Sequence, residues 1–141
     1  MTSDFLFVYG TLMRAFDNPY AGLLRQSANF VEKAWVAGRL FLVKGHDFSY
    51  PVLLPENVGG QRVTGEVYHF HHAGARQKAL QVLDAYEGVD PQTGQGEEYM
   101  REILEVVTVS GEGLQCMVYA ATALPNLPEI RTGDFLKYTG N

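Results

Sequence analysis

One amphipathic helix among strand-like segments is the feature that most limits the folds available to this chain. In residues 73–86 the apolar side chains recur at spacings of three and four, which predicts a helix with one buried face. Gly88 follows, and glycine is common just after the end of a helix. The other patterned segments are short and rich in aromatic and β-branched residues, as strands are. We therefore expect an α+β protein. The apolar residues assigned to the buried face of the helix are Ala79, Val82, Leu83 and Tyr86.

Six segments predict strands, and they suggest a small barrel-like sheet with the main helix packed against it. Gly38 lies in the middle of the second segment, where it predicts a bend or a bulge. Residues 20–26 could form one or two helical turns, and the tail after residue 121 is expected to be irregular. The predicted strands are residues 5–9, 30–43, 50–54, 62–70, 99–109 and 114–121.

Composition indicates one globular domain spanning residues 1–141, because 46% of the residues are hydrophobic and 19% are charged. The formal net charge of −5 argues against binding to nucleic acids or anionic membranes. No apolar stretch is long enough to cross a bilayer, and no basic leader is visible. Cys116 is the only cysteine, which excludes an intramolecular disulfide and a thiolate metal cage. These features predict a soluble cytoplasmic protein.

Glu87 is the residue most suggestive of catalysis. Leu80 and Leu83 lie seven and four positions before it, so Glu87 continues the apolar face of the predicted helix. The C-terminal end of a helix carries partial negative charge, which together with burial raises the pKa of a carboxyl group. Such a group suits proton transfer near neutral pH. If the last turn frays instead, Glu87 points into water and has no such role.

The end of the first strand offers backbone amides for binding. Tyr9, Gly10, Thr11 and Leu12 lead out of the buried segment. Consecutive amides at the mouth of a sheet can hold a carboxylate or a developing oxyanion. The alternative is an ordinary strand-to-loop turn capped by the threonine.

The remaining reactive side chains indicate no cofactor. His69, His71 and His72 are close in sequence, and the first two would share a strand face, but a metal site needs a third ligand that no motif supplies. Cys116 has no partner that would mark it as a nucleophile, so a packed structural thiol is expected. The glycine-rich nucleotide-binding motifs and the serine hydrolase elbow are absent from the sequence.

Five short motifs occur in the order in which a known family has them. Residues 7–14 read Phe-Val-Tyr-Gly-Thr-Leu-Met-Arg, and residues 63–68 read Val-Thr-Gly-Glu-Val-Tyr. Residues 83–88 read Leu-Asp-Ala-Tyr-Glu-Gly, residues 99–101 Tyr-Met-Arg and residues 118–119 Val-Tyr. Together they resemble the γ-glutamylcyclotransferase-like family, which includes the AIG2-like proteins. The Tyr-Gly-Thr-Leu opening is similar to the branch that acts on γ-glutamylamines.

This resemblance implies a small mixed β-barrel with a cavity at one end and no cofactor. It implies that the α-amine of a γ-glutamyl group attacks its own γ-carbonyl, which forms 5-oxoproline and releases an amine. Glu87 would be the general acid/base of this reaction. The expected partner is a small molecule that carries a γ-glutamyl group. The residues expected to bind it are Tyr9, Gly10, Thr11, Leu12, Tyr99 and Tyr119.

Two other functions remain compatible with the sequence. One is a related amide-cleaving or acyl-shifting reaction in which Glu87 has the same role. The other is a module that binds a small ligand without turnover. The sequence favours an enzyme, because a binding module needs no carboxylate on an apolar helix face. Tyr99 and Arg101 lie two residues apart on one predicted strand, so they should share a face. At least one of them, more readily Tyr99, is expected to border the cavity.

Overall fold

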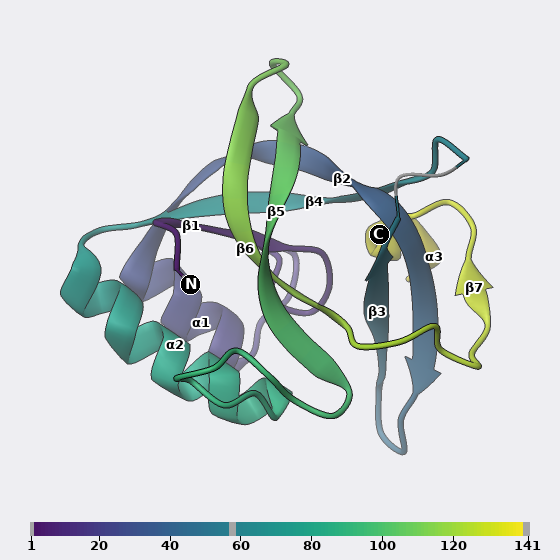
Figure 1. Cartoon of the computed structure of the whole chain (residues 1–141), viewed down its shortest axis with the longest axis horizontal. Helices are drawn as coiled ribbons and strands as arrows, with labels where there is room; N and C mark the ends of the chain where they lie inside the picture. The colour runs from purple at the N-terminus through teal and green to yellow at the C-terminus, as the bar shows by residue number, and fades with distance from the viewer. Residues whose placement is uncertain (1, 57–58, 140–141) are drawn as a thin grey trace.

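The computed structural model describes residues 2–56 and 59–139 (Figure 1). These residues form seven strands and three helices. The strands are β1 (Phe5–Val8), β2 (Ala28–Lys44), β3 (Ser49–Pro55), β4 (Arg62–Phe70), β5 (Tyr99–Thr108), β6 (Gly113–Ala121) and β7 (Glu129–Ile130). The helices are α1 (Pro19–Ser27), α2 (Ala73–Glu87) and α3 (Phe135–Tyr138).

Five of the strands close into a mixed barrel, in the order β2-β4-β1-β6-β5. The barrel closes where β5 pairs with β2, with Trp35 opposite Val107. Neighbouring strands are antiparallel except β1 and β6, which run parallel with Leu6 opposite Met117. The expected small mixed β-barrel with a main helix is therefore confirmed. The strands β3 and β7 extend it by pairing with β2 outside the closed part.

The long strand β2 belongs to both parts of this sheet. Residues 28–37 pair with β4, and residues 38–44 pair with β3. Gly38 therefore marks the position where β2 changes partner. The register irregularity lies between Phe30 and Glu32 instead, so of the two alternatives expected at Gly38, a bend or a bulge, the bulge is wrong. The glycine is needed there because a Cβ atom would lie 2.6 Å from the carbonyl oxygen of Leu54.

Helix α2 packs on the barrel with a different face from the predicted one. Its buried residues are Ala79, Leu80, Leu83 and Asp84. The assignment of Val82 and Tyr86 to the buried face is wrong, because 43% and 41% of these residues are exposed. The buried face differs from the predicted one because Asp84 pairs with the buried side chain of Arg101. Tyr86 instead stacks on Tyr20 of the neighbouring helix α1, with ring centroids 3.9 Å apart.

The tail after residue 121 is more regular than expected. Glu129 and Ile130 form the short strand β7, opposite Phe41 and Leu40 of β2. Phe135 of α3 is 1% exposed and packs into the core. A two-residue strand and a four-residue helix are too short to show a period in the sequence, so they could not be read from it.

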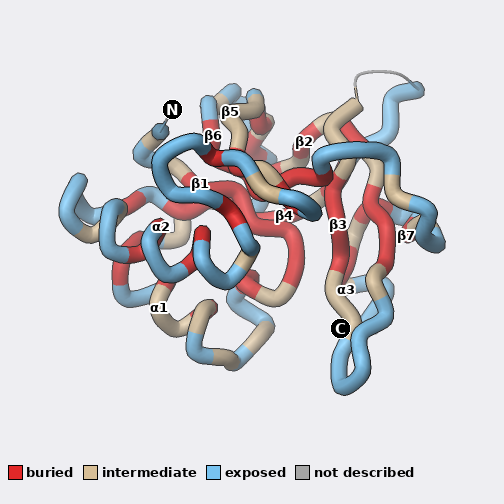
Figure 2. Tube along the Cα trace, turned by 60° about the horizontal axis from the view of Figure 1, so that its bottom comes forward, coloured by how far each residue is buried: buried red, intermediate tan, exposed pale blue. Residues whose placement is uncertain are grey.

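The core fills the barrel and the space between the barrel and α2, where buried residues follow the strands (Figure 2). Its largest fully buried side chains include Tyr68, Phe7, Phe70 and Met117. No helix within the described residues is long and apolar enough to cross a membrane.

Candidate active site

A cavity of about 920 Å³ lies where the end of β1, the end of α2 and the following loop meet. The tip of the β2–β3 hairpin and the start of β5 complete its wall. A volume of this order is typical of small-molecule sites. Every site residue expected from the sequence lines it. These residues are Tyr9, Gly10, Thr11, Leu12, Glu87, Tyr99 and Tyr119.

Glu87 is the last residue of α2, and it borders the cavity. Burial, followed by the negative charges of Glu98 and Asp84, raises the pKa of Glu87 to about 7. Helix α2 ends there because Gly88 adopts the left-handed conformation, with φ of +73°. The sequence indicated the burial of Glu87, but it did not indicate its two acidic neighbours. A carboxyl group with this pKa can both accept and donate a proton at neutral pH.

The turn after β1 lines the same cavity with Gly10, Thr11 and Leu12. Met13 closes it by donating its amide hydrogen to the carbonyl of Gly10 at 3.1 Å. Within residues 2–56 and 59–139, the amides of Gly10, Thr11 and Leu12 have no hydrogen-bond acceptor. Residue 10 must be glycine because a Cβ atom would lie 2.8 Å from the side chain of Pro51. Three unpaired donors next to a cavity are suited to a carboxylate or an oxyanion.

A buried carboxylate under this turn holds it in place. Glu66 of β4 is 3% exposed and accepts a hydrogen bond from the amide of Arg14 at 2.8 Å. The hydroxyl of Tyr68 donates to the same carboxylate at 3.2 Å. The guanidinium of Arg14 lies 3.6 Å from the ring centroid of Phe30. Sequence reasoning missed Glu66 as a site residue, although a charged residue within a buried strand is a signal of such a role.

Three of the tyrosines that line the cavity, Tyr9, Tyr99 and Tyr119, use their hydroxyl hydrogens inside the protein. Tyr9 donates to the carbonyl of Tyr119 at 2.5 Å and accepts from the amide of Leu53 at 3.3 Å. Tyr99 donates to the carbonyl of Pro51 at 3.1 Å, and Tyr119 donates to Asp84 at 2.6 Å. Burial raises the pKa of each of these hydroxyls, so they stay protonated at neutral pH. They therefore offer a ligand ring surfaces and oxygen lone pairs rather than protons.

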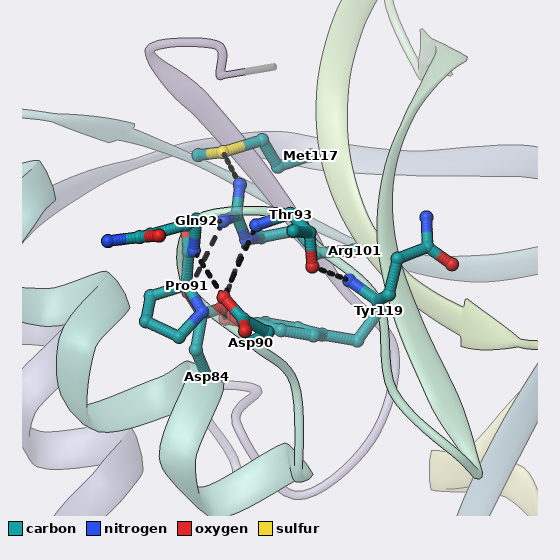
Figure 3. A network of polar contacts seen from close by, with 9 residues as sticks. Asp84, Asp90, Pro91, Gln92, Thr93, Arg101, Met117 and Tyr119 are labelled. Carbon is teal, nitrogen blue, oxygen red and sulfur yellow. Dashed lines mark hydrogen bonds and ion pairs between the residues drawn. The ribbon is translucent and has the colours of Figure 1, made fainter.

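Arg101 does not line the cavity but anchors the helix that carries Glu87. Its guanidinium contacts both carboxylate oxygens of Asp84, at 3.0 and 3.3 Å, and donates to the carbonyl of Pro91 at 3.1 Å (Figure 3). Asp84 is 0% exposed, so this is a buried ion pair. It ties the end of α2 and the loop after it to β5. Of the two residues expected to share a face, Tyr99 borders the cavity and Arg101 does not.

The remaining reactive side chains, two histidines and the cysteine, have capping or packing roles. His72 caps α2 by accepting from the amide of Ala75 at 3.1 Å, and His69 packs against the ring of Phe5. In the part of the chain that the structure describes, no group of three potential ligands is arranged for a metal ion. Cys116 is 0% exposed, and burial raises the pKa of its thiol to about 12.

The family model described as gamma-glutamyl cyclotransferase, AIG2-like, matches residues 6–137. The chain belongs to this family. A mouse AIG2-like protein is similar to it in structure, with a TM-score of 0.66 and 26% identity over 93% of this chain and 88% of the mouse chain. A structure named gamma-glutamyl cyclotransferase has a TM-score of 0.61 and 21% identity over 89% of this chain and 70% of its own.

The gamma-glutamyl cyclotransferase, AIG2-like fold also occurs inside a larger protein. An allophanate hydrolase of Kluyveromyces lactis contains a region similar to 99% of this chain, with a TM-score of 0.66 and 18% identity. This chain covers only 21% of that protein. At this identity the likeness shows the fold alone. No curated protein sequence matches the chain significantly.

Proposed function

We propose that this protein is a γ-glutamylcyclotransferase that converts a γ-glutamyl amide into 5-oxoproline and a free amine. One observation carries the proposal. A carboxyl group with a pKa of about 7 borders the same small cavity as a turn with three unpaired backbone amides. The cyclisation needs these two elements, a group that moves a proton and donors that stabilise negative charge on oxygen. Membership of the gamma-glutamyl cyclotransferase, AIG2-like family supports the same reaction.

The first step forms the ring. The carboxylate of Glu87 accepts a proton from the α-ammonium of the substrate, and the resulting amine attacks the γ-carbonyl carbon. The carbonyl oxygen becomes an oxyanion, which the amides of residues 10–12 can stabilise. Because amine and carbonyl belong to one molecule, the cavity has only to hold it in the reactive conformation.

The second step breaks the amide bond. The oxyanion collapses to a carbonyl, and the bond between the γ-carbon and the leaving nitrogen breaks. The protonated Glu87 gives its proton to this nitrogen. The ring nitrogen loses a second proton, and the released amine ends as an ammonium ion at neutral pH. The charges and atoms balance without an external reactant, and Glu87 returns to its carboxylate form.

A 5-oxoproline assay on neutral γ-glutamyl alkylamides tests the proposal. We expect turnover by the wild-type protein and a loss of roughly 10²–10⁴-fold in Glu87→Gln, the usual contribution of a general acid/base. Glu105→Gln is the matched control, because Glu105 is exposed on β5 and does not line the cavity. Turnover that survives in Glu87→Gln would contradict the assigned role. Wild-type protein that binds these amides without releasing 5-oxoproline would be a binding module instead.

A further inference from the structure

The charged side chains at the cavity are all acidic. Glu87, Asp90, Glu97 and Glu98 line it, and among the described residues no lysine, arginine or histidine does. A γ-glutamyl group brings one α-carboxylate, for which the unpaired amides of residues 10–12 are available. A second carboxylate, carried by the leaving amine, would lie among like charges, which is unfavourable. The lining therefore discriminates between leaving groups by their charge.

The hydroxyl groups of the lining strengthen this discrimination. The hydroxyls of Tyr9, Tyr99 and Tyr119 donate to protein acceptors. Tyr50 is a fourth case, because its hydroxyl donates to the carboxylate of Glu98 at 3.0 Å. The wall thus presents four carboxylates, aromatic rings and the oxygen lone pairs of these four tyrosines, beside the side-chain donors of Thr11, Tyr86, Thr93 and Gln95. Such a wall suits a ligand that brings its own hydrogen-bond donors and positive charge.

The outer part of the cavity combines a carboxylate with aromatic rings, and we name Phe48, Tyr50 and Glu98 the amine rim. Phe48 is 58% exposed at the tip of the β2–β3 hairpin, and its ring centroid lies 6.2 Å from that of Tyr50. Glu98 lies in the loop before β5 and is held by Tyr50. Ammonium groups bind to aromatic faces and to carboxylates, and here both are on the same wall.

We propose that the amine rim binds the leaving group as a cation, so that the preferred substrates are γ-glutamyl amides of small diamines or polyamines. This inference rests on the proposed function for the reaction, but the charge preference can be measured without it. A diamine is favoured over free lysine as the leaving group, because lysine adds a carboxylate to a wall whose charged side chains are all acidic. A cavity of about 920 Å³ also has room for an extended small amine.

Four amides test the preference in a 5-oxoproline assay. They are the γ-glutamyl amides of 1,4-diaminobutane, n-pentylamine and 5-aminopentanoate, and the ε-linked γ-glutamyl-lysine. The first three have similar length and differ in charge. We expect kcat/KM for the diaminobutane amide to be about ten-fold higher than for the pentylamide, and lowest for the aminopentanoate amide. The lysine compound should lie below the diaminobutane amide. Added salt should reduce the preference.

Substitutions in the amine rim test which residues cause the preference for a positively charged leaving amine. Glu98→Gln should lower the ratio of kcat/KM between the diaminobutane amide and the pentylamide toward one, and Phe48→Leu should lower it less. Using the ratio removes any effect of Glu98 on Glu87, since that effect applies to both substrates. Glu105→Gln removes the same charge far from the cavity and should keep the wild-type ratio. A wild-type ratio of one, or a ratio that Glu98→Gln leaves unchanged, would overturn the inference while leaving the proposed reaction intact.

Equilibrium binding separates the two proposals if no amide is turned over. In that case the proposed reaction is wrong, and calorimetry with the same diaminobutane amide and pentylamide still measures the charge preference. Tighter binding of the diaminobutane amide, weakened in Glu98→Gln, would support the amine rim. Equal binding of the two amides would overturn it.

Discussion

Glu66 and Arg14 lie 52 residues apart in the chain, yet the carboxylate of Glu66 accepts the backbone amide of Arg14 at 2.8 Å. This bond fixes the end of the turn that lines the cavity. Because Glu66 is only 3% exposed, the turn is attached to the core rather than to the surface. The turn with the three unpaired amides is thus held at one end by a buried carboxylate.

Glu66→Leu should therefore disturb binding as well as stability. The variant leaves the amide of Arg14 and the hydroxyl of Tyr68 without their acceptor, which costs about 1–3 kcal/mol of unfolding free energy. We also expect KM to rise, since the amides of residues 10–12 lose their fixed position. Glu66→Gln keeps an acceptor oxygen and should show a smaller change in both. If Glu66→Leu loses stability and keeps the wild-type KM, the carboxylate is only structural.

Removal of the Arg101 guanidinium should cost more stability than removal of the Tyr119 hydroxyl, although both groups contact Asp84. Arg101→Met leaves the buried Asp84 without its charged partner, which typically costs about 3–5 kcal/mol. Tyr119→Phe removes one hydrogen bond to Asp84 and should cost about 2 kcal/mol. Chemical denaturation of both variants and the wild type measures these differences. A loss below about 1 kcal/mol in Arg101→Met would show that the ion pair contributes little.

The stability of the protein should depend on pH through Glu87. Its pKa in the folded protein is about 7, above the ordinary value of 4.5, so the folded state binds more protons than the unfolded state between these values. The stability contributed by protonation is complete below about 4.5 and is lost as pH rises through about 7. In thermal melts, the Tm of Glu87→Gln should not show the loss of stability that the wild type shows as pH rises toward 7. Above about pH 7, the Tm of the variant should equal or exceed that of the wild type. Parallel pH dependence in both proteins would contradict the raised pKa.

The acid side of the activity profile should move in Glu98→Gln. In the wild type, kcat/KM for a neutral γ-glutamyl alkylamide should rise with pH as Glu87 loses its proton at about pH 7. The negative charge of Glu98 is one of the causes of this pKa. Its removal should shift the rising limb to lower pH, because the carboxylate form of Glu87 becomes easier to form. In the Glu105→Gln control, the rise of kcat/KM with pH should occur at the same pH as in the wild type.

Cys116 should be unreactive in the folded protein. It is 0% exposed, and burial raises the pKa of its thiol to about 12, so almost no thiolate exists at neutral pH. We expect an alkylating reagent to label it at the rate of unfolding, and denaturant to make labelling fast. Rapid labelling of native protein would show that β6 opens locally.

The sequence predicted the parts of the site that depend on local pattern. Glu87 follows an apolar helix face, and Gly10 ends a buried strand, so both could be placed at the edge of the core. The buried partners could not be predicted in the same way. Asp84 and Arg101 lie 17 residues apart, and only the packing of α2 on β5 shows that they meet.

The same limit explains the errors in the helix and the tail. Val82 and Tyr86 have the spacing of a buried face, but the pairing of Asp84 with Arg101 decides which side of α2 turns inward. Ala79, Leu80 and Leu83 also have apolar spacing, so the polar pair favours that face over the one with Val82 and Tyr86. The strand β7 forms only because β2 offers it an edge, which is a property of the whole sheet.

The hydroxyls of Tyr9 and Tyr99 connect the walls of the cavity before any ligand arrives. Tyr9 joins β1 to β6 and β3, and Tyr99 joins β5 to β3. The inner end of the cavity is thus rigid, and a ligand entering it orders little that is not already ordered. Changes to this inner end would damage folding before they altered selectivity. A protein engineer who wants this scaffold to accept a new amine should therefore vary Phe48 and Glu98 and leave the inner tyrosines alone.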